Sequence, residues 1–133
     1  MPLKSNPEPD AADKDFFCQL RHKVELQISE YVYEVPTGAI GTRLSPDQIR
    51  ADLELMRLCL IEPRWEEVNI CTTPEEIRTG IGSTRPCVTM AEDAGHVLVF
   101  DLASNEFYLA WRSELGLGTW GIRGDAVGCF IAR

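Results

Sequence analysis

ELGLGTWGIRGDAVGCFIAR, residues 114–133, is the stretch that decides between a nucleotide-binding fold and a simpler α+β fold. It contains the pattern G-x-G-x-x-G at Gly116, Gly118 and Gly121, directly after the strand-like segment FYLAW. A dinucleotide-binding loop also needs a helix that opens at the third glycine and a later strand with an acidic residue. The residues after Gly121 contain further glycines and the apolar run VGCFI, which favour extended structure over a helix. No P-loop pattern occurs either, so we predict no nucleotide or other cofactor.

The glycines of this stretch have a mechanical interpretation. Glycine is the residue that most readily adopts the positive φ angles of tight bends. We therefore predict a tight glycine-rich connection over residues 116–128, with Trp120 at its tip or edge. The segment VGCFIAR, residues 127–133, is predicted to be a final strand that completes a sheet.

The N-terminal part of the chain predicts a tail followed by a helix. Residues 1–12 hold three prolines, several charges and almost no large apolar side chains, which is typical of a flexible tail. A helix is predicted over residues 14–29, capped by Asp13 and followed by an extended segment, YVYEVP, at residues 31–36. The apolar stripe of this helix recurs every four residues and consists of Phe16, Leu20, Val24 and Ile28.

A second helix is predicted in LSPDQIRADLELMRLCLIEP, residues 44–63. Ser45 suits the N-cap, Pro46 suits the first helical position, and Pro63 prevents continuation. The apolar stripe of this helix consists of Ile49, Leu53, Met56 and Leu60.

The remainder of the chain alternates between a short helix and strands. Thr73 and Glu76 form a capping box for a short helix that stops at Gly80. Apolar and β-branched runs separated by turn residues predict strands at residues 64–71, 87–93, 96–101 and 106–111. We therefore predict one α+β domain over residues 13–133. It is an antiparallel sheet of four or five strands in the C-terminal half, packed by two longer helices and one short helix from the N-terminal half.

Charge and hydropathy limit the classes of partner. The formal net charge is −8, and the pI is near 4.7. An acidic surface repels phosphate backbones and favours association with basic proteins, so we expect a basic protein partner and no direct nucleic-acid contact. No apolar run is long enough for a membrane helix, and the N-terminus lacks the apolar region of a secretory signal. We therefore expect a cytoplasmic protein without membrane contact.

The five cysteines predict buried, reduced thiols. Their number is odd and none forms a C-x-x-C pair, which argues against a disulfide framework or a zinc site. Four have apolar neighbours, as is typical of core thiols, namely Cys18, Cys59, Cys71 and Cys129.

Catalytic motifs are absent, and two functional alternatives to simple binding remain open. One is a small enzyme whose site combines His96, and Asp93 or Glu92, with a cysteine or Asp125. The other is an adaptor subunit that docks through its N-terminal tail. No motif carries the activity of a known family over to this chain.

The favoured hypothesis is a non-catalytic acidic binding protein. It would dock on a basic partner and block it, as immunity and antitoxin-type inhibitors do. Tryptophan and arginine often dominate the binding energy of protein interfaces. The predicted partner-binding residues are Trp120, Arg123 and Asp125 in the glycine-rich stretch, with Glu92 and Asp93 at an acidic hairpin tip.

Overall fold

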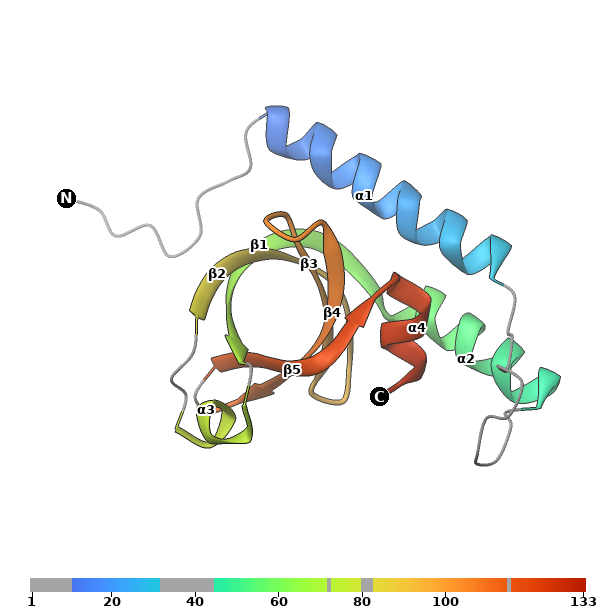
Figure 1. Ribbon diagram of the computed structural model, residues 1–133. Coiled ribbons are helices and arrows are strands. Elements are labelled where there is room, and N and C mark those ends of the chain that lie inside the picture. Colours follow the sequence, from blue (N-terminus) through green and yellow to red (C-terminus); the bar gives the residue numbers. More distant parts are fainter. Residues whose placement is uncertain (1–10, 32–44, 72, 80–82, 115) are drawn as a thin grey trace.

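The described part of the chain forms a five-stranded barrel with helices around it (Figure 1). A computed structural model describes residues 11–31, 45–71, 73–79, 83–114 and 116–133. The strands are β1 (Leu60–Cys71), β2 (Ser83–Asp93), β3 (His96–Asp101), β4 (Glu106–Ser113) and β5 (Gly116–Gly124). The helices are α1 (Ala11–Glu30), α2 (Pro46–Cys59), α3 (Pro74–Thr79) and α4 (Ala126–Ile131).

The barrel is closed by one parallel strand pair. Strands β1 to β5 pair in sequence order, and each of these pairings is antiparallel. Strand β5 then pairs in parallel with β1, with Val68 opposite Leu117 and Cys71 opposite Trp120. The predicted α+β class is confirmed in this coarse sense. The parallel pair and the closure were not predicted, because hydrophobic alternation shows which segments are strands but not how the first and last of them meet.

The glycine-rich stretch is itself a strand, so the predicted loop over residues 116–128 is wrong. Leu117 and Thr119 are buried, and they alternate with exposed or half-buried glycines. Gly116 and Gly121 have φ angles of 98° and 82°, which only glycine adopts without strain, and they allow the strand to bend. Trp120 therefore lies within β5, and the placement of its side chain falls outside the described part of the structure.

The predicted final strand is also wrong, because residues 126–131 form helix α4. The Asp125 side chain caps this helix and accepts a hydrogen bond from the Gly128 amide at 3.0 Å. The Ala126 amide donates to the side chain of Gln27 on α1 at 2.7 Å. These two acceptors satisfy amides at the helix start, and Phe130 is buried against the barrel.

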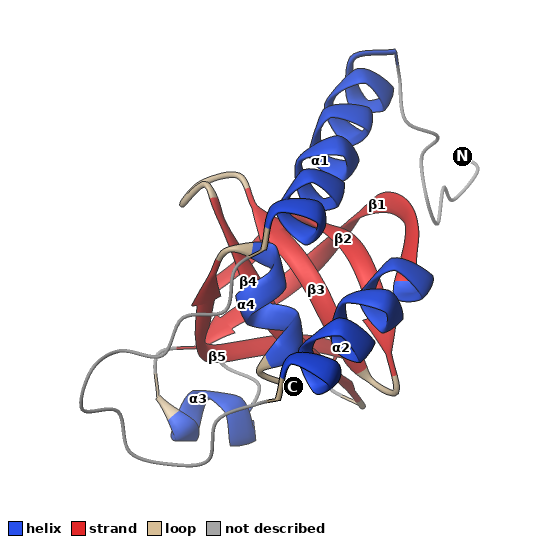
Figure 2. Ribbon diagram, turned by 90° about the vertical axis from the view of Figure 1, so that its right-hand side faces the viewer, coloured by secondary structure: helices blue, strands red, loops and turns tan. Residues whose placement is uncertain are grey.

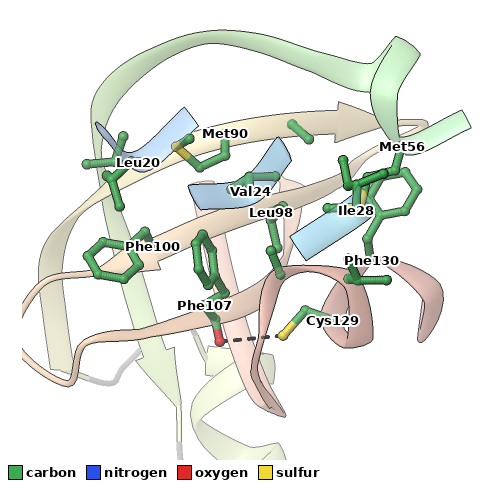
Figure 3. Packing of buried hydrophobic residues seen from close by; sticks show 14 of the residues in the cluster. Leu20, Val24, Ile28, Met56, Met90, Leu98, Phe100, Phe107, Cys129 and Phe130 are labelled. Atoms are coloured by element: carbon green, nitrogen blue, oxygen red, sulfur yellow. Dashed lines mark hydrogen bonds between the residues drawn. The ribbon is translucent and has the colours of Figure 1, made fainter. Parts of the chain in front are cut away.

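Helices α1, α2 and α4 cover one side of the barrel (Figure 2). The predicted stripe of α1 is confirmed, with Leu20, Val24 and Ile28 buried and Phe16 half-buried. Their side chains pack on outward-facing residues of β2, β3 and β4 (Figure 3), among them Met90, Leu98, Phe100, Phe107 and Leu109. Among the described residues, no helix is both long enough and apolar enough to cross a membrane.

Several helix boundaries differ from the prediction. Helix α1 begins at Ala11, so Asp13 lies in its first turn rather than at its cap, and residues 11 and 12 are not tail. Residues 1–10 and 32–36 lie outside the described part of the chain. Helix α2 is capped by Ser45 as predicted but ends at Cys59, and Pro63 lies inside β1. A proline is tolerated there because the pairing of β1 with β2 is irregular between Leu60 and Arg64.

The short helix α3 begins as its capping box predicts. The Glu76 amide donates to the Thr73 hydroxyl at 3.2 Å, and that hydroxyl lies 3.4 Å from the Glu76 carboxylate. The predicted stop at Gly80 lies outside the described residues.

The barrel interior is small and mainly apolar. Its inward-facing residues alternate along each strand with the outward-facing ones. They include Val68, Cys87, Val97, Val99, Tyr108, Ala110 and Leu117, with buried Thr89 and Thr119. Charged side chains occupy both ends of this interior. Glu66 and Arg112 lie at one end, and Arg85 pairs with the buried Asp101 at the other, at 2.8 Å.

Candidate partner-binding surface

One end of the barrel is closed by a balanced cluster of charges. Arg112 on β4 contacts Glu66 on β1 at 3.1 and 3.2 Å and Glu92 on β2 at 2.5 Å. Arg64 contacts the same two carboxylates at 2.9 and 2.7 Å, and the Thr89 hydroxyl donates to Glu66 at 2.9 Å. Burial alone would raise the pKa of Glu66, but hydrogen bonds from Arg112 and Thr89 and the nearby guanidinium groups lower it below its ordinary value.

The predicted partner-binding residues have structural partners of their own. Glu92 belongs to the charge cluster, and the Asp93 carboxylate accepts from Arg133 Nε at 2.7 Å. Asp125 is the N-cap of α4. Arg123 is well exposed and lies 3.8 Å from Glu106, at the limit of an ion pair.

These residues also do not form one surface. Glu92 contacts Arg112 near the end of β4. Arg123 of β5 lies opposite Tyr108 of β4 in the strand register, and Tyr108 precedes Arg112 by four residues. Four residues of a strand span about 13 Å, so the two predicted groups lie at opposite ends of the barrel wall. Hydrophobic spacing could not show this, because it depends on the register of β4 and β5.

His96 is not paired with a cysteine. Its ring lies 6.1 Å from Trp111 on the outer face of the barrel, whereas Cys87 faces the interior. The Cys129 thiol donates to the Phe107 carbonyl at 3.5 Å beneath α4 (Figure 3). Burial raises the pKa of both the Cys87 and Cys129 thiols to about 12. Among the described residues, no cluster of histidine, cysteine and carboxylate side chains could hold a metal ion.

Trp65 is an exposed aromatic residue whose ring packs against two rings of α1. It lies on the outer face of β1, opposite Val88, and about a third of it is exposed. Its ring is nearly parallel to that of Phe16, with centroids 6.0 Å apart, and lies 5.8 Å from the Phe17 ring. Two rings of α1 therefore fix the orientation of an indole that still faces solvent.

A groove lies between α1 and the start of β1, beside this indole. Its volume is about 490 Å³. The Arg21 guanidinium reaches across from α1 and donates to the Ile61 carbonyl at 3.4 Å. The groove is lined by Lys14, Phe17, Cys18 and Arg21 of α1 and by Glu62 and Pro63 of β1.

Two carboxylates of β1 have no cation partner among the described residues: Glu62 lines this groove, and Glu67 lies on the same face of the strand as Trp65. Every arginine in the described ranges lies within 4.0 Å of a carboxylate, namely Arg21, Arg50, Arg57, Arg64, Arg78, Arg85, Arg112, Arg123 and Arg133. Glu62 and Glu67 have no such partner within the same ranges, and both are exposed. We call Trp65, Glu62, Glu67 and the groove the Trp65 surface.

The sequence itself contains a signal for this surface. Trp65 and Glu67 are two residues apart in a predicted strand, so they share a face. The glycines around Trp120 predict an exposed loop at that residue, but they belong to strand β5. Comparison with known proteins adds no candidate, because the chain matches no protein-family model, no curated protein and no solved structure.

Proposed function

We propose that this protein is a non-catalytic binding protein that docks on a basic protein partner through the Trp65 surface, in the manner of immunity and antitoxin-type inhibitors. The observation that carries the proposal is the juxtaposition of an exposed, oriented indole with a groove and two carboxylates that have no cation partner in the described part of the chain. The net charge of −8 supports a partner of opposite charge.

Both the fixed orientation of the indole and the charge of its neighbours favour binding. An indole already held by Phe16 and Phe17 loses little side-chain entropy when a partner covers it. Tryptophans in such positions are frequent interface hot spots, where truncation weakens binding by about 2 kcal/mol or more. Glu62 and Glu67 would meet cationic side chains of the partner without first breaking an ion pair.

Site-specific photocrosslinking in the producing cells tests this proposal. Benzoylphenylalanine is placed at position 65, and in a matched control at position 58, where Leu58 of α2 is 82% exposed. We expect one basic protein to crosslink from position 65 and not from position 58. The recombinant pair should then form a one-to-one complex whose association rate falls with added salt.

Charge reversal supplies the decisive variant. Glu62→Lys with Glu67→Lys should weaken the recombinant complex at least about tenfold. Glu30→Lys with Asp52→Lys, at helix carboxylates away from the Trp65 surface, should change it little. An acidic crosslinked partner would overturn the proposal. So would equal losses of affinity in the two double variants.

A further inference from the structure

We infer that the Trp65 surface recognises an arginine side chain of the partner, stacked on the indole with its guanidinium held by Glu67. This inference rests on the proposed function and specifies the chemical group that is bound. Indole is the aromatic ring that attracts cations most strongly, and arginine is the cation found over it most often.

The spacing of the strand suits this arrangement. Trp65 and Glu67 lie on the same outer face of β1, and successive residues on one face of a strand are about 7 Å apart. A guanidinium over the six-membered part of an indole can reach a carboxylate at that separation. Phe16 and Phe17 cover part of the ring, and about a third of Trp65 stays exposed to a partner.

No cation of the described chain occupies this position. The cation–π contacts among the described residues involve Phe100, Phe107 and Phe130 rather than Trp65. The side chain of the neighbouring Arg64 lies on the opposite face of β1 and is bound to Glu66 and Glu92 at the barrel end. The exposed indole and Glu67 are therefore open to a cation from another molecule.

Arginine fits better than lysine for two reasons. The guanidinium is planar and weakly hydrated, so it can lie flat on an indole at a small desolvation cost. It also has five N–H donors in a fixed fork, so it can bind both oxygens of the Glu67 carboxylate while it stacks. An ammonium group is a strongly hydrated point charge and would meet one carboxylate from above the ring.

Blocked tetrapeptides provide the probe. The full-length ¹⁵N-labelled protein is titrated at low salt with acetylated tetra-arginine amide, tetra-lysine amide or tetra-glutamine amide, and the indole N–H signals are followed. We expect tetra-arginine to shift the Trp65 signal with an apparent Kd at least about fivefold lower than that of tetra-lysine. Tetra-glutamine should not shift it.

Variants keep this experiment decisive. Glu67→Gln leaves the Trp65 packing intact and should weaken tetra-arginine binding at least about threefold. Trp111→Leu is the matched control, because Trp111 is 37% exposed and the exposed Glu114 follows it three residues later. It should leave the titration of the Trp65 signal unchanged.

The failure of this inference is distinguishable from failure of the proposed function. Equal affinities of tetra-arginine and tetra-lysine, both dependent on Glu67, would overturn the choice of arginine and leave a basic partner in place. A tetra-arginine titration that shifts Trp111 but not Trp65 would overturn the site assigned to the cation. The proposed function itself is tested by the crosslinked partner and its charge-reversal variants.

Discussion

Arg112 of β4 and Glu66 of β1 are joined by two hydrogen bonds, of 3.1 and 3.2 Å, between strands that are not neighbours in the barrel. Strand β5 lies between them, and its ladder with β1 starts only at Val68. The ion pair therefore links β1 to β4 just before the backbone ladder begins. Side chains thus close this end of the barrel, before the first backbone pair between β1 and β5 that the structure describes.

The first prediction is that Glu66 makes the fold sensitive to acid. The pKa of Glu66 is lowered in the folded state, so its stabilising contribution is fully present above its ordinary value of 4.5. That contribution is lost as the pH falls below 4.5 and the folded carboxylate takes up a proton. Glu66→Gln should lower the free energy of unfolding at pH 7 by about 1.5–3 kcal/mol, the scale of hydrogen bonds to charged groups.

Urea unfolding of both proteins at a series of pH values measures this effect. The difference between wild type and Glu66→Gln should shrink below pH 4.5. Glu54→Gln is the control, because Glu54 pairs with Arg57 on the exposed face of α2 and should change stability by less than about 0.5 kcal/mol. A difference that is independent of pH would contradict the role assigned to the Glu66 charge.

The second prediction concerns the cap of α4. A methyl group on Gly128 would lie 2.8 Å from the Asp125 carboxylate oxygen, which is too close. Gly128→Ala should therefore disturb the cap and destabilise the protein, although alanine is the better helix former. In an Asp125→Ala background the same change should stabilise by about 0.5–1 kcal/mol, because the clash is gone.

Thermal or urea unfolding of the four proteins in this cycle decides the point. Asp125→Ala alone should cost about 1 kcal/mol, the usual loss for an N-cap. If Gly128→Ala has the same sign in both backgrounds, Asp125 does not cap α4 in solution. Its charge would then be available for the partner contact first predicted for it.

The third prediction distinguishes the cysteines. Cys18 is exposed on α1, whereas Cys71, Cys87 and Cys129 are buried. The prediction of buried thiols is thus wrong for Cys18, which lies on the groove side of α1 beside the buried Phe17, and Cys59 is only half-buried. Iodoacetamide at neutral pH should alkylate Cys18 first and leave Cys87 and Cys129 unmodified until the protein unfolds.

Peptide mass spectrometry after timed alkylation measures these rates. Rapid modification of Cys87 in the folded protein would show that the barrel interior opens readily. Because Cys18 lines the groove, a bulky maleimide there should also block the crosslinked partner, and the same label on a Leu58→Cys, Cys18→Ser variant should not.

The sequence alone predicts those elements whose buried face follows from the spacing of their own apolar residues. The stripe of α1 and the cap of α2 at Ser45 follow from residues within one helix. The hairpins of β2, β3 and β4 follow from alternation and turn residues. Helix α4 was missed because VGCFI prefers a strand by itself, and the groups that make it a helix include Gln27, 99 residues away in sequence.

The candidate site was less predictable because it joins distant segments. The exposure of Trp65 depends on how α1 packs against β1, and single-strand patterns carry no such information. Similarly, Glu92 and Asp93 looked like a free acidic hairpin tip, but Arg112 and Arg133 come to them from other elements. What the sequence did contain was the shared face of Trp65 and Glu67 in a predicted strand.

The last prediction returns to the pattern G-x-G-x-x-G. A nucleotide-binding loop would need the second glycine, Gly118, for close approach of the phosphates. In this barrel Gly118 has an ordinary backbone conformation, and an added methyl group would meet only the Asn69 carbonyl at 3.8 Å. Gly118→Ala should therefore be tolerated. Gly121 has a φ of 82°, and Gly121→Ala should cost about 1–2 kcal/mol through backbone strain alone.

Urea unfolding of the two alanine variants compares these positions directly, and Gly116→Ala, at a φ of 98°, should behave like Gly121→Ala. Space does not limit any of the three substitutions, since nothing lies within 4 Å of a methyl group at Gly116 or Gly121. The ranking thus isolates the backbone conformation as the cause. If Gly118→Ala proved the most harmful and abolished saturable binding of NAD or ATP, the pattern would be a nucleotide site, and the mechanical explanation of β5 would be wrong.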